Sequence, residues 1–408
     1  MEVPRIAVVG LGGFAQSHLR YVEAVERAGL GRHVAQVAIP ADQEAFAARV
    51  AELVQRGIAV YPSLRVLLAE ARDQVDVLCI PTGIPLHRAM TVAALEAGCH
   101  CLVEKPAAGA IQDVDAMLAA VERAGRLCAV GYQHVYQPEM QRVKEWICQG
   151  RLGRVQEARG FGCWPRAPQY YGRNGWAGRL AVGDTWVLDS PHNNALAHAV
   201  NLLCWMACDQ PHASLEPVAV QAELYRANAI ESADTAVLRV RTREGAVVFF
   251  AVSHCTEENV NPLFAITGEK GRLEVSYEGH VRARWSDGTQ EEVRAQTAER
   301  QGVLEDVVLT VSGVREHLAC PLRVTRAQTL CICGSFESSA VHELPAGLRT
   351  VDPGSGAVVV RGMSQVVQRA FEEGALFSEL GVEWARAGNP VSLEGYTYFP
   401  TFRRRVGE

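Results

Sequence analysis

Short runs of branched apolar residues alternate with longer amphipathic stretches through the first third of the chain. The apolar runs predict strands at 5–9, 34–39, 75–80, 100–104 and 127–132. The amphipathic stretches predict helices at 13–28, at 42–57, from about Pro85 onward, and at 113–125. Strands that alternate with helices of about 10–15 residues are typical of βαβ units in a parallel sheet.

The turn after the first predicted strand is rich in glycine and reads GLGGFA (10–15). Gly10 allows the tight turn, Gly12 lets a pyrophosphate approach the backbone, and the small Ala15 permits close packing of helix on strand. The start of the following helix attracts phosphate groups. The turn therefore predicts a dinucleotide site that includes Gly10, Gly12, Gly13, Phe14 and Ala15.

The second predicted strand ends without the residue that usually selects the cofactor. It runs into Ile39 and Pro40, where an acidic residue would bind the ribose hydroxyls of NAD. No arginine stands there for a 2′-phosphate, and Asp42 is expected to cap the next helix. We therefore expect NAD or NADP, with NAD slightly favoured.

Composition narrows the class of protein. The chain has 408 residues, 48% hydrophobic and 21% charged, with a formal net charge of −6. This length suits two domains, and the charge disfavours nucleic acid or an anionic membrane as partner. No secretory signal or membrane-spanning stretch is expected, and the 12 cysteines include no C-x-x-C pair. Reduced, buried thiols in a cytoplasmic protein are the prediction.

Four further stretches carry a family resemblance: PTGIPLH (81–87), AALEAGCHCLVEKP (93–106), VGYQHVYQP (130–138) and QGRLGRV (149–155). With GLGGFA they resemble, in order, the Gfo/Idh/MocA family of sugar and polyol dehydrogenases. Weaker matches lie at 176–178, 186–198 and 320–339. The EKP tripeptide is the most specific, since the family has it at the end of the fifth strand.

The resemblance implies an α/β fold with a Rossmann NAD(P)-binding domain at 1–137. A substrate-binding and oligomerisation α/β domain with a large, open, mostly antiparallel sheet would occupy 138–408. The chain is longer than most members, and we place the excess after about residue 285, with an extra hairpin or loop near 351–358. Relatives often pair through the open sheet, so a homodimer or homotetramer is expected.

The resemblance also implies roles on the cofactor side. Lys105 would hydrogen-bond the reacting hydroxyl, because a cationic nicotinamide and partial burial lower the pKa of a lysine there. Glu104 would orient Lys105 or the cofactor. The remaining residues expected to line the cofactor are Pro81, Thr82, His87 and Gln133.

The stretch WVLDSPHNNALAH (186–198) aligns with the family's D-x-x-x-H, but Asn193 replaces the histidine. An asparagine cannot accept a proton as a general base. Three interpretations stay open: Asn193 holds a substrate hydroxyl while Lys105 is the base aided by Asp189; His192 is shifted into the site; or His198, expected on the same helix as Asn194, is the base. Asp189, His192 and His198 lack metal-ligand spacing, so no metal is expected.

The segment 163–180 is rich in aromatic residues and arginine. Sugars offer hydroxyls and apolar ring faces, so such side chains suit a carbohydrate or an acidic sugar. The candidates for substrate contact are Trp164, Arg166, Tyr170, Arg173 and Trp176.

The sequence thus predicts an NAD(P)-dependent oxidoreductase. Hydride would pass between nicotinamide and a secondary alcohol or ketone of a sugar, polyol or sugar derivative. One alternative is an enzyme that retains NAD and uses transient oxidation to drive glycosidic elimination or hydrolysis. Another is a nucleotide sensor without catalysis, which the intact EKP disfavours.

Overall fold

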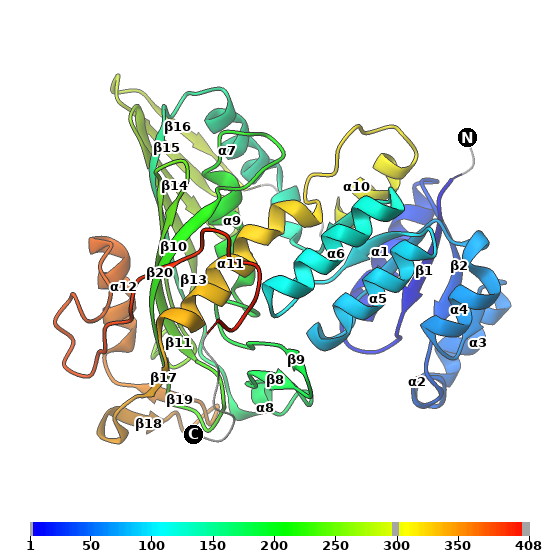
Figure 1. Cartoon of the computed structure of the whole chain (residues 1–408), viewed down its shortest axis with the longest axis horizontal. Coiled ribbons are helices and arrows are strands. Elements are labelled where there is room, and N and C mark those ends of the chain that lie inside the picture. Colours follow the sequence, from blue (N-terminus) through cyan, green and yellow to red (C-terminus); the bar gives the residue numbers. More distant parts are fainter. Residues whose placement is uncertain (1–2, 296–301, 402–408) are drawn as a thin grey trace. The chain divides into compact units, whose positions relative to one another are not determined.

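A computed structural model of the chain describes residues 3–295 and 302–401 (Figure 1). The described residues form two compact units. The first unit takes its residues from 1–108, 113–136 and 298–325, and the second takes them from 109–112, 137–297 and 326–408.

The first unit is built on a six-stranded parallel sheet with the order β3-β2-β1-β4-β5-β6. This order is that of a dinucleotide-binding Rossmann sheet. The strands are β1 (Arg5–Val9), β2 (Arg32–Val37), β3 (Ala59–Tyr61), β4 (Val77–Ile80), β5 (His100–Val103) and β6 (Cys128–Val130). The helices of this unit are α1 (Ala15–Arg27), α2 (Pro40–Ala45), α3 (Ala47–Gln55), α4 (Leu64–Ala71), α5 (Ile84–Glu96), α6 (Ile111–Ala124) and α10 (Gly302–Val311). Most predicted elements are confirmed within one to three residues.

One local prediction was wrong, and one strand–helix pair was missed. The single helix expected at 42–57 is α2 followed by α3, because Phe46 leaves helical geometry with φ −119° and ψ 34°. The pair β3 and α4 was not predicted, since β3 has only three residues at the edge of the sheet. Ser63 marks the start of α4, accepting a hydrogen bond from the backbone N–H of Val66 at 3.2 Å.

A segment far along the sequence completes the core of the first unit. Val303, Leu304, Val307 and Val308 of α10 are buried in the cluster that holds Ile6 of β1 and residues of α1. Period-3.6 burial explains why α10 is a helix, but its partner surface lies almost 300 residues earlier. Tertiary structure alone assigns α10 to this unit.

The second unit is built on a ten-stranded, mostly antiparallel sheet with the order β16-β15-β14-β13-β7-β12-β11-β10-β17, in which β20 also pairs with β10. Two neighbouring pairs are parallel, β7 with β12 and β10 with β17. The strands are β7 (Val155–Cys163), β10 (Pro217–Arg226), β11 (Thr235–Thr242), β12 (Val247–Ser253), β13 (Val260–Gly268), β14 (Gly271–Ser276), β15 (Val281–Trp285), β16 (Gln290–Val293), β17 (Val341–Glu343) and β20 (Val391–Ser392). The α/β fold class predicted from the sequence is confirmed.

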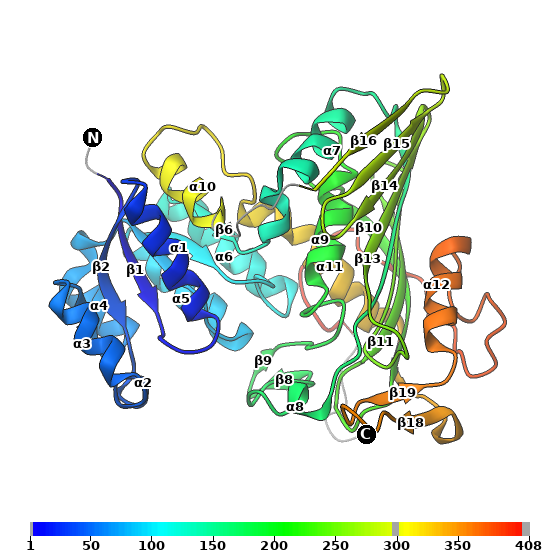
Figure 2. The same ribbon diagram turned by 180° about the vertical axis from the view of Figure 1, so that it is seen from behind.

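Helices cover both faces of this sheet (Figures 1 and 2). On one face lie α7 (Pro138–Cys148), α9 (Ala197–Met206) and α11 (Leu322–Ser338), and on the other lies α12 (Met363–Glu373). Met363, Val367 and Phe371 of α12 are buried in one cluster with Phe161 and Phe249 of the sheet. The segment near 351–358, where an extra hairpin or loop was expected, connects β18 (Arg349–Val351) to β19 (Val358–Val360) in a hairpin.

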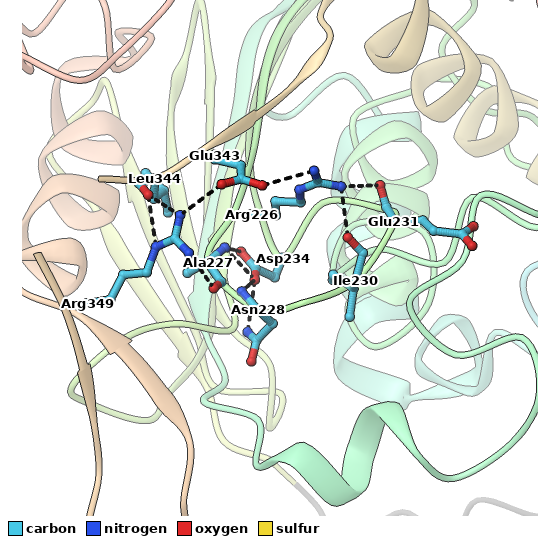
Figure 3. A network of polar contacts seen from close by, with 9 residues as sticks. All are labelled: Arg226, Ala227, Asn228, Ile230, Glu231, Asp234, Glu343, Leu344 and Arg349. Carbon is cyan, nitrogen blue, oxygen red and sulfur yellow. Dashed lines mark hydrogen bonds and ion pairs between the residues drawn. The ribbon is translucent and has the colours of Figure 1, made fainter. Parts of the chain in front are cut away.

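Ion pairs fasten this hairpin to the edge of the sheet (Figure 3). Glu343 of β17 lies between Arg226 of β10, at 3.1 Å, and Arg349, at 3.7 Å. Beside them the buried carboxylate of Asp234 accepts hydrogen bonds from the backbone N–H groups of Ala227 and Asn228, both at 2.8 Å. These contacts fix the turn after β10 and the first strand of the hairpin.

Candidate active site

The glycine-rich turn lies between the end of β1 and the start of α1. Gly10 has φ 85° and Gly13 has φ 55°, a left-handed conformation that glycine adopts without strain. The backbone N–H of Gly10 donates to Val37 at 2.7 Å, and the Gln36 amide donates to the Gly10 carbonyl at 2.6 Å. A Cβ on Gly12 would lie 3.1 Å from the Phe46 ring. Gln36, which the sequence did not single out, thus braces the turn.

The other predicted cofactor residues of the first unit lie on the same edge of its sheet. Pro81 and Thr82 follow β4, Glu104 and Lys105 follow β5, and Gln133 lies three residues after β6. The carboxyl ends of parallel strands meet at one edge, where open α/β sheets bind their ligands. The hydroxyl of Thr82 is buried without a hydrogen-bond partner among the described residues.

Glu104 forms a buried pair with His18 of α1. Its Oε1 lies 3.0 Å from Nε2 of His18, whose side chain is 1% exposed. Its Oε2 accepts the backbone N–H of Lys105 at 3.1 Å. A Cβ on Gly131 would lie 2.5 Å from Oε1, so a side chain there would have to displace the Glu104 carboxylate. Glu104 therefore braces the backbone of Lys105, and His18 is a partner that the sequence did not indicate.

His87 lies between the loops that follow β4 and β5. Its Nδ1 is 2.9 Å from the Pro106 carbonyl and its Nε2 is 2.9 Å from the Thr82 carbonyl. Burial lowers the pKa of His87, while the carbonyls of Thr82 and Pro106 oppose this shift. The imidazole thus links the two loops from α5.

In the second unit, Asp189 is buried in the turn that precedes α9. Its Oδ2 accepts the backbone N–H of Gly178 at 2.6 Å and lies 3.3 Å from the Arg173 guanidinium. Its Oδ1 accepts from the amide of Asn194 at 2.6 Å. Burial raises the pKa of Asp189, while Arg173 and the other donors oppose the shift. A carboxylate with three donors, one of them the cationic Arg173, keeps a fixed orientation.

Asn193 braces the same turn. Its amide nitrogen donates to the carbonyls of Val187, at 3.0 Å, and Leu188, at 3.2 Å, while its oxygen accepts from Gln328 at 3.0 Å. Leu188 has φ 48°, a strained conformation for a branched residue. Asn193 therefore holds this strained backbone in place.

The two histidines of this stretch lie differently from the helical arrangement expected. Residues 191–196 form turns, and α9 begins only at Ala197, so His198 is not on one helix with Asn194; that expectation was wrong. Ser335 donates its hydroxyl proton to Ile332 at 2.7 Å, so Nε2–H of His192 must donate to Ser335 at 3.0 Å. Burial lowers the pKa of His192 to about 3, and its ring stacks on Phe336.

We expect a His192→Gln variant to keep the wild-type pH profile. A glutamine amide can still donate to Ser335, and a group with a pKa near 3 does not titrate between pH 5 and 9. Turnover should stay within about threefold of wild type while unfolding costs about 1 kcal/mol less. Steady-state rates across pH check this. Loss of a titration in that range would show that His192 is the base.

The aromatic and arginine residues of 163–180 gather beside Asp189. The Arg173 guanidinium lies 3.8 Å from the ring centroid of Tyr170 and 5.1 Å from that of Trp176. The Arg166 guanidinium lies 4.9 Å from Tyr170 and 5.2 Å from Trp164. The structure thus brings all five substrate candidates together.

His254 belongs to this cluster and was missed by sequence reasoning. It follows β12, and its Nδ1 lies 2.8 Å from the Trp164 carbonyl. The backbone N–H of Arg166 donates to the His254 carbonyl at 3.1 Å. The signal that could have found it is a lone histidine directly after an apolar strand, VVFFAVSH (247–254).

Two further observations concern the described residues only. No group of three or more histidine, cysteine, aspartate or glutamate side chains among them could hold a metal ion. None of the described helices is both long and apolar enough to cross a membrane.

Comparison with known proteins identifies the lineage. Residues 4–132 match the family model "Oxidoreductase family, NAD-binding Rossmann fold", and residues 140–274 match the model of the GFO/IDH/MocA C-terminal domain. The chain belongs to the Gfo/Idh/MocA family. Its first unit is that family's NAD-binding Rossmann domain, and the resemblance inferred from the motifs is confirmed.

Two individual relatives show how far the sequence similarity extends. An inositol 2-dehydrogenase/D-chiro-inositol 3-dehydrogenase from Halalkalibacterium halodurans is 28% identical over 207 residues, 50% of this chain and 53% of that protein. A 4-carboxy-2-hydroxymuconate-6-semialdehyde dehydrogenase from a Sphingobium species is 29% identical over 148 residues, 36% of this chain and 44% of that protein. The matched segments thus span about half the length of these relatives or less.

A solved structure shares the fold over most of the chain. It is the WlbA dehydrogenase from Chromobacterium violaceum, solved in complex with NADH and UDP-GlcNAcA. It has 23% sequence identity and a TM-score of 0.67, covering 82% of this chain and 93% of that one.

Proposed function

We propose that this protein is an NAD(P)-dependent dehydrogenase that acts on a secondary alcohol or ketone of a sugar, polyol or sugar derivative. The observation that carries the proposal is the place of Lys105. It follows β5 on the edge that also holds the glycine-rich turn, and Glu104 fixes its backbone. A single ionisable amine at a dinucleotide edge suits proton transfer to and from an alcohol.

The first unit fits a dinucleotide. The glycine turn has positive φ at Gly10 and Gly13, and the space above Gly12 is limited by Phe46, so a side chain there would crowd the turn. The orphaned hydroxyl of Thr82 offers a hydrogen bond on the same edge. When bound, the nicotinamide would supply hydride acceptor and donor chemistry. Ile39 lies two residues after β2 and is half exposed. The sequence has neither an acid that would bind the ribose nor an arginine that would bind a 2′-phosphate at this place, and NAD stays slightly favoured.

In the proposed mechanism Lys105 removes the proton of the substrate hydroxyl during oxidation and returns it during reduction. Asp189, held by Gly178 and Asn194, keeps the role of aid to the base that the sequence predicted for it. Asn193 keeps the turn rigid and can hold a substrate hydroxyl through its oxygen. His192 and His198 have no assigned proton-transfer step.

Names of relatives support this class of reaction. They include dehydrogenases of inositol and of a carboxylated semialdehyde, and the WlbA structure contains NADH and a nucleotide sugar acid. The cytoplasmic location and the homodimer or homotetramer stay predictions.

The test is a thermal-shift comparison of NAD and NADP with the full chain, followed by a panel of sugars and polyols read by nicotinamide absorbance. We expect at least one cofactor to raise the melting temperature by a few degrees, since a ligand that binds only the folded state stabilises it. No shift with either cofactor would overturn the proposal.

A further inference from the structure

Tyr170 of the second unit contacts two arginines, Arg166 and Arg173, which differ in their acidic partners. Arg173 has an acidic partner, because Asp189 lies 3.3 Å away. Among the residues that the structure describes, Arg166 forms no ion pair, and its Nε is buried without a hydrogen-bond partner. The cluster of Arg166, Arg173 and Asp189 therefore carries one positive charge in excess.

The backbone of Arg166 is held by the ends of two neighbouring parallel strands. Trp164 donates its N–H to Ser253 at 3.1 Å, and Arg166 donates its N–H to His254 at 3.1 Å. Trp164 is anchored a second time, since its indole N–H donates to Asn261 at 2.9 Å. The guanidinium thus rests on a rigid base between the rings of Trp164 and Tyr170.

His254 is uncharged, so it adds no positive charge to that of Arg166. Burial, and next the charge of Arg166, lower the pKa of His254 to about 3, so the ring is neutral. Tyr170 is neutral too, because burial and then Asp189 raise the pKa of its hydroxyl to about 12. Among the residues that the structure describes, neither His254 nor Tyr170 carries a negative charge that would neutralise the guanidinium of Arg166.

A half-buried guanidinium without an acidic partner costs free energy when a ligand covers it, unless that ligand carries an anion. A carboxylate fits the planar fork with two parallel hydrogen bonds. A single excess charge matches a carboxylate better than a phosphate monoester, which carries a charge of about −1.5 to −2.

We propose that Arg166 binds a carboxylate of the substrate, so that the alcohol oxidised belongs to a polyhydroxy acid such as a uronic or aldonic acid. This inference rests on the proposed function and narrows its substrate class. Arg166 is a specificity-determining residue, and it takes no part in hydride or proton transfer.

The experiment measures binding by calorimetry to the full chain loaded with NADH. The probes are matched pairs of acid and neutral counterpart: D-glucuronate and D-glucose, D-gluconate and D-glucitol, L-tartrate and L-threitol. D-glucose 6-phosphate tests the phosphate alternative. We expect at least one acid to bind about tenfold or more tighter than its neutral partner, and Arg166→Gln to reduce this preference to about twofold or less.

Two variants sharpen the test. Arg166→Lys should keep part of the preference, since it retains the charge but not the fork. Arg241→Gln, which removes an exposed arginine of β11, should keep all of it. The inference is overturned if no acid is preferred, if Arg166→Gln keeps the preference, if Arg241→Gln loses it equally, or if the phosphate binds tightest. If NADH itself does not bind, the proposed function falls as well; if NADH binds and a neutral sugar is oxidised without acid preference, only this inference falls.

Discussion

A Lys105→Met variant is expected to lose about 10²–10⁴-fold in kcat while it binds NAD as the wild type does. Methionine keeps much of the length and volume of lysine but has no proton to exchange with the substrate hydroxyl. The glycine-rich turn at 10–15 and the pair of Glu104 with His18 stay in place, so binding should be unaffected. Single-turnover rates and a thermal shift with NAD measure the two effects separately.

Two controls separate proton transfer from charge and from general damage. Lys105→Arg keeps a positive charge, but a guanidinium does not deprotonate, so it should be almost as slow as Lys105→Met. Lys270→Met removes an exposed lysine and should be as active as the wild type. Near-normal turnover by Lys105→Met would show that another group carries the proton.

A Lys144→Met variant is expected to lose about 2–4 kcal/mol of unfolding free energy. Lys144 on α7 is 4% exposed, and its ammonium donates to the carbonyls of Trp205 and Cys208, both at 2.7 Å, and of Ala213, at 3.2 Å. Burial lowers the pKa of Lys144, and the carbonyls at the end of α9 are the acceptors that hold the charge. Methionine would fill the space but leave these carbonyls without their donor.

Urea unfolding of the purified variants measures this loss, with Lys270→Met as the matched control that should stay within about 0.5 kcal/mol of wild type. The chain has only three lysines, so Lys105, Lys144 and Lys270 offer one chemical, one structural and one neutral test of the same substitution. A Lys144→Met protein as stable as the wild type would mean that burial of the charge costs as much as its hydrogen bonds contribute.

Local pattern predicted the first unit because its strands are continuous apolar runs and its helices are amphipathic. Val77–Ile80 and His100–Val103 are buried at nearly every position, as a parallel sheet covered on both faces requires. The same reasoning overlooked β3, because three residues are too few to show a period. It also joined α2 to α3, because the amphipathic pattern continues across Phe46. In the structure Phe46 leaves helical geometry, and its ring lies near Gly12.

The site was predictable where it depends on backbone geometry and on a short motif. Gly10 has the positive φ that the tight turn of the motif requires, and Lys105 follows β5, the strand end at which the sequence predicted it. The turn before α9 was not predictable in the same way. Asn193 is there to brace a strained Leu188, and Asp189 contacts Asn194 rather than the residue four positions on.

The sequence by itself determined the alternation of strand and helix, the dinucleotide turn and the family, because these depend on residues close together in the chain. Tertiary structure decided which distant segments meet: α10 in the core of the first unit, α12 on the sheet of the second, and His254 beneath Arg166. The tertiary structure also distinguishes Arg166 from Arg173, since only the fold shows that Asp189 pairs with Arg173. Charge compensation and burial are properties of neighbours in space, and the order of residues along the chain does not contain them.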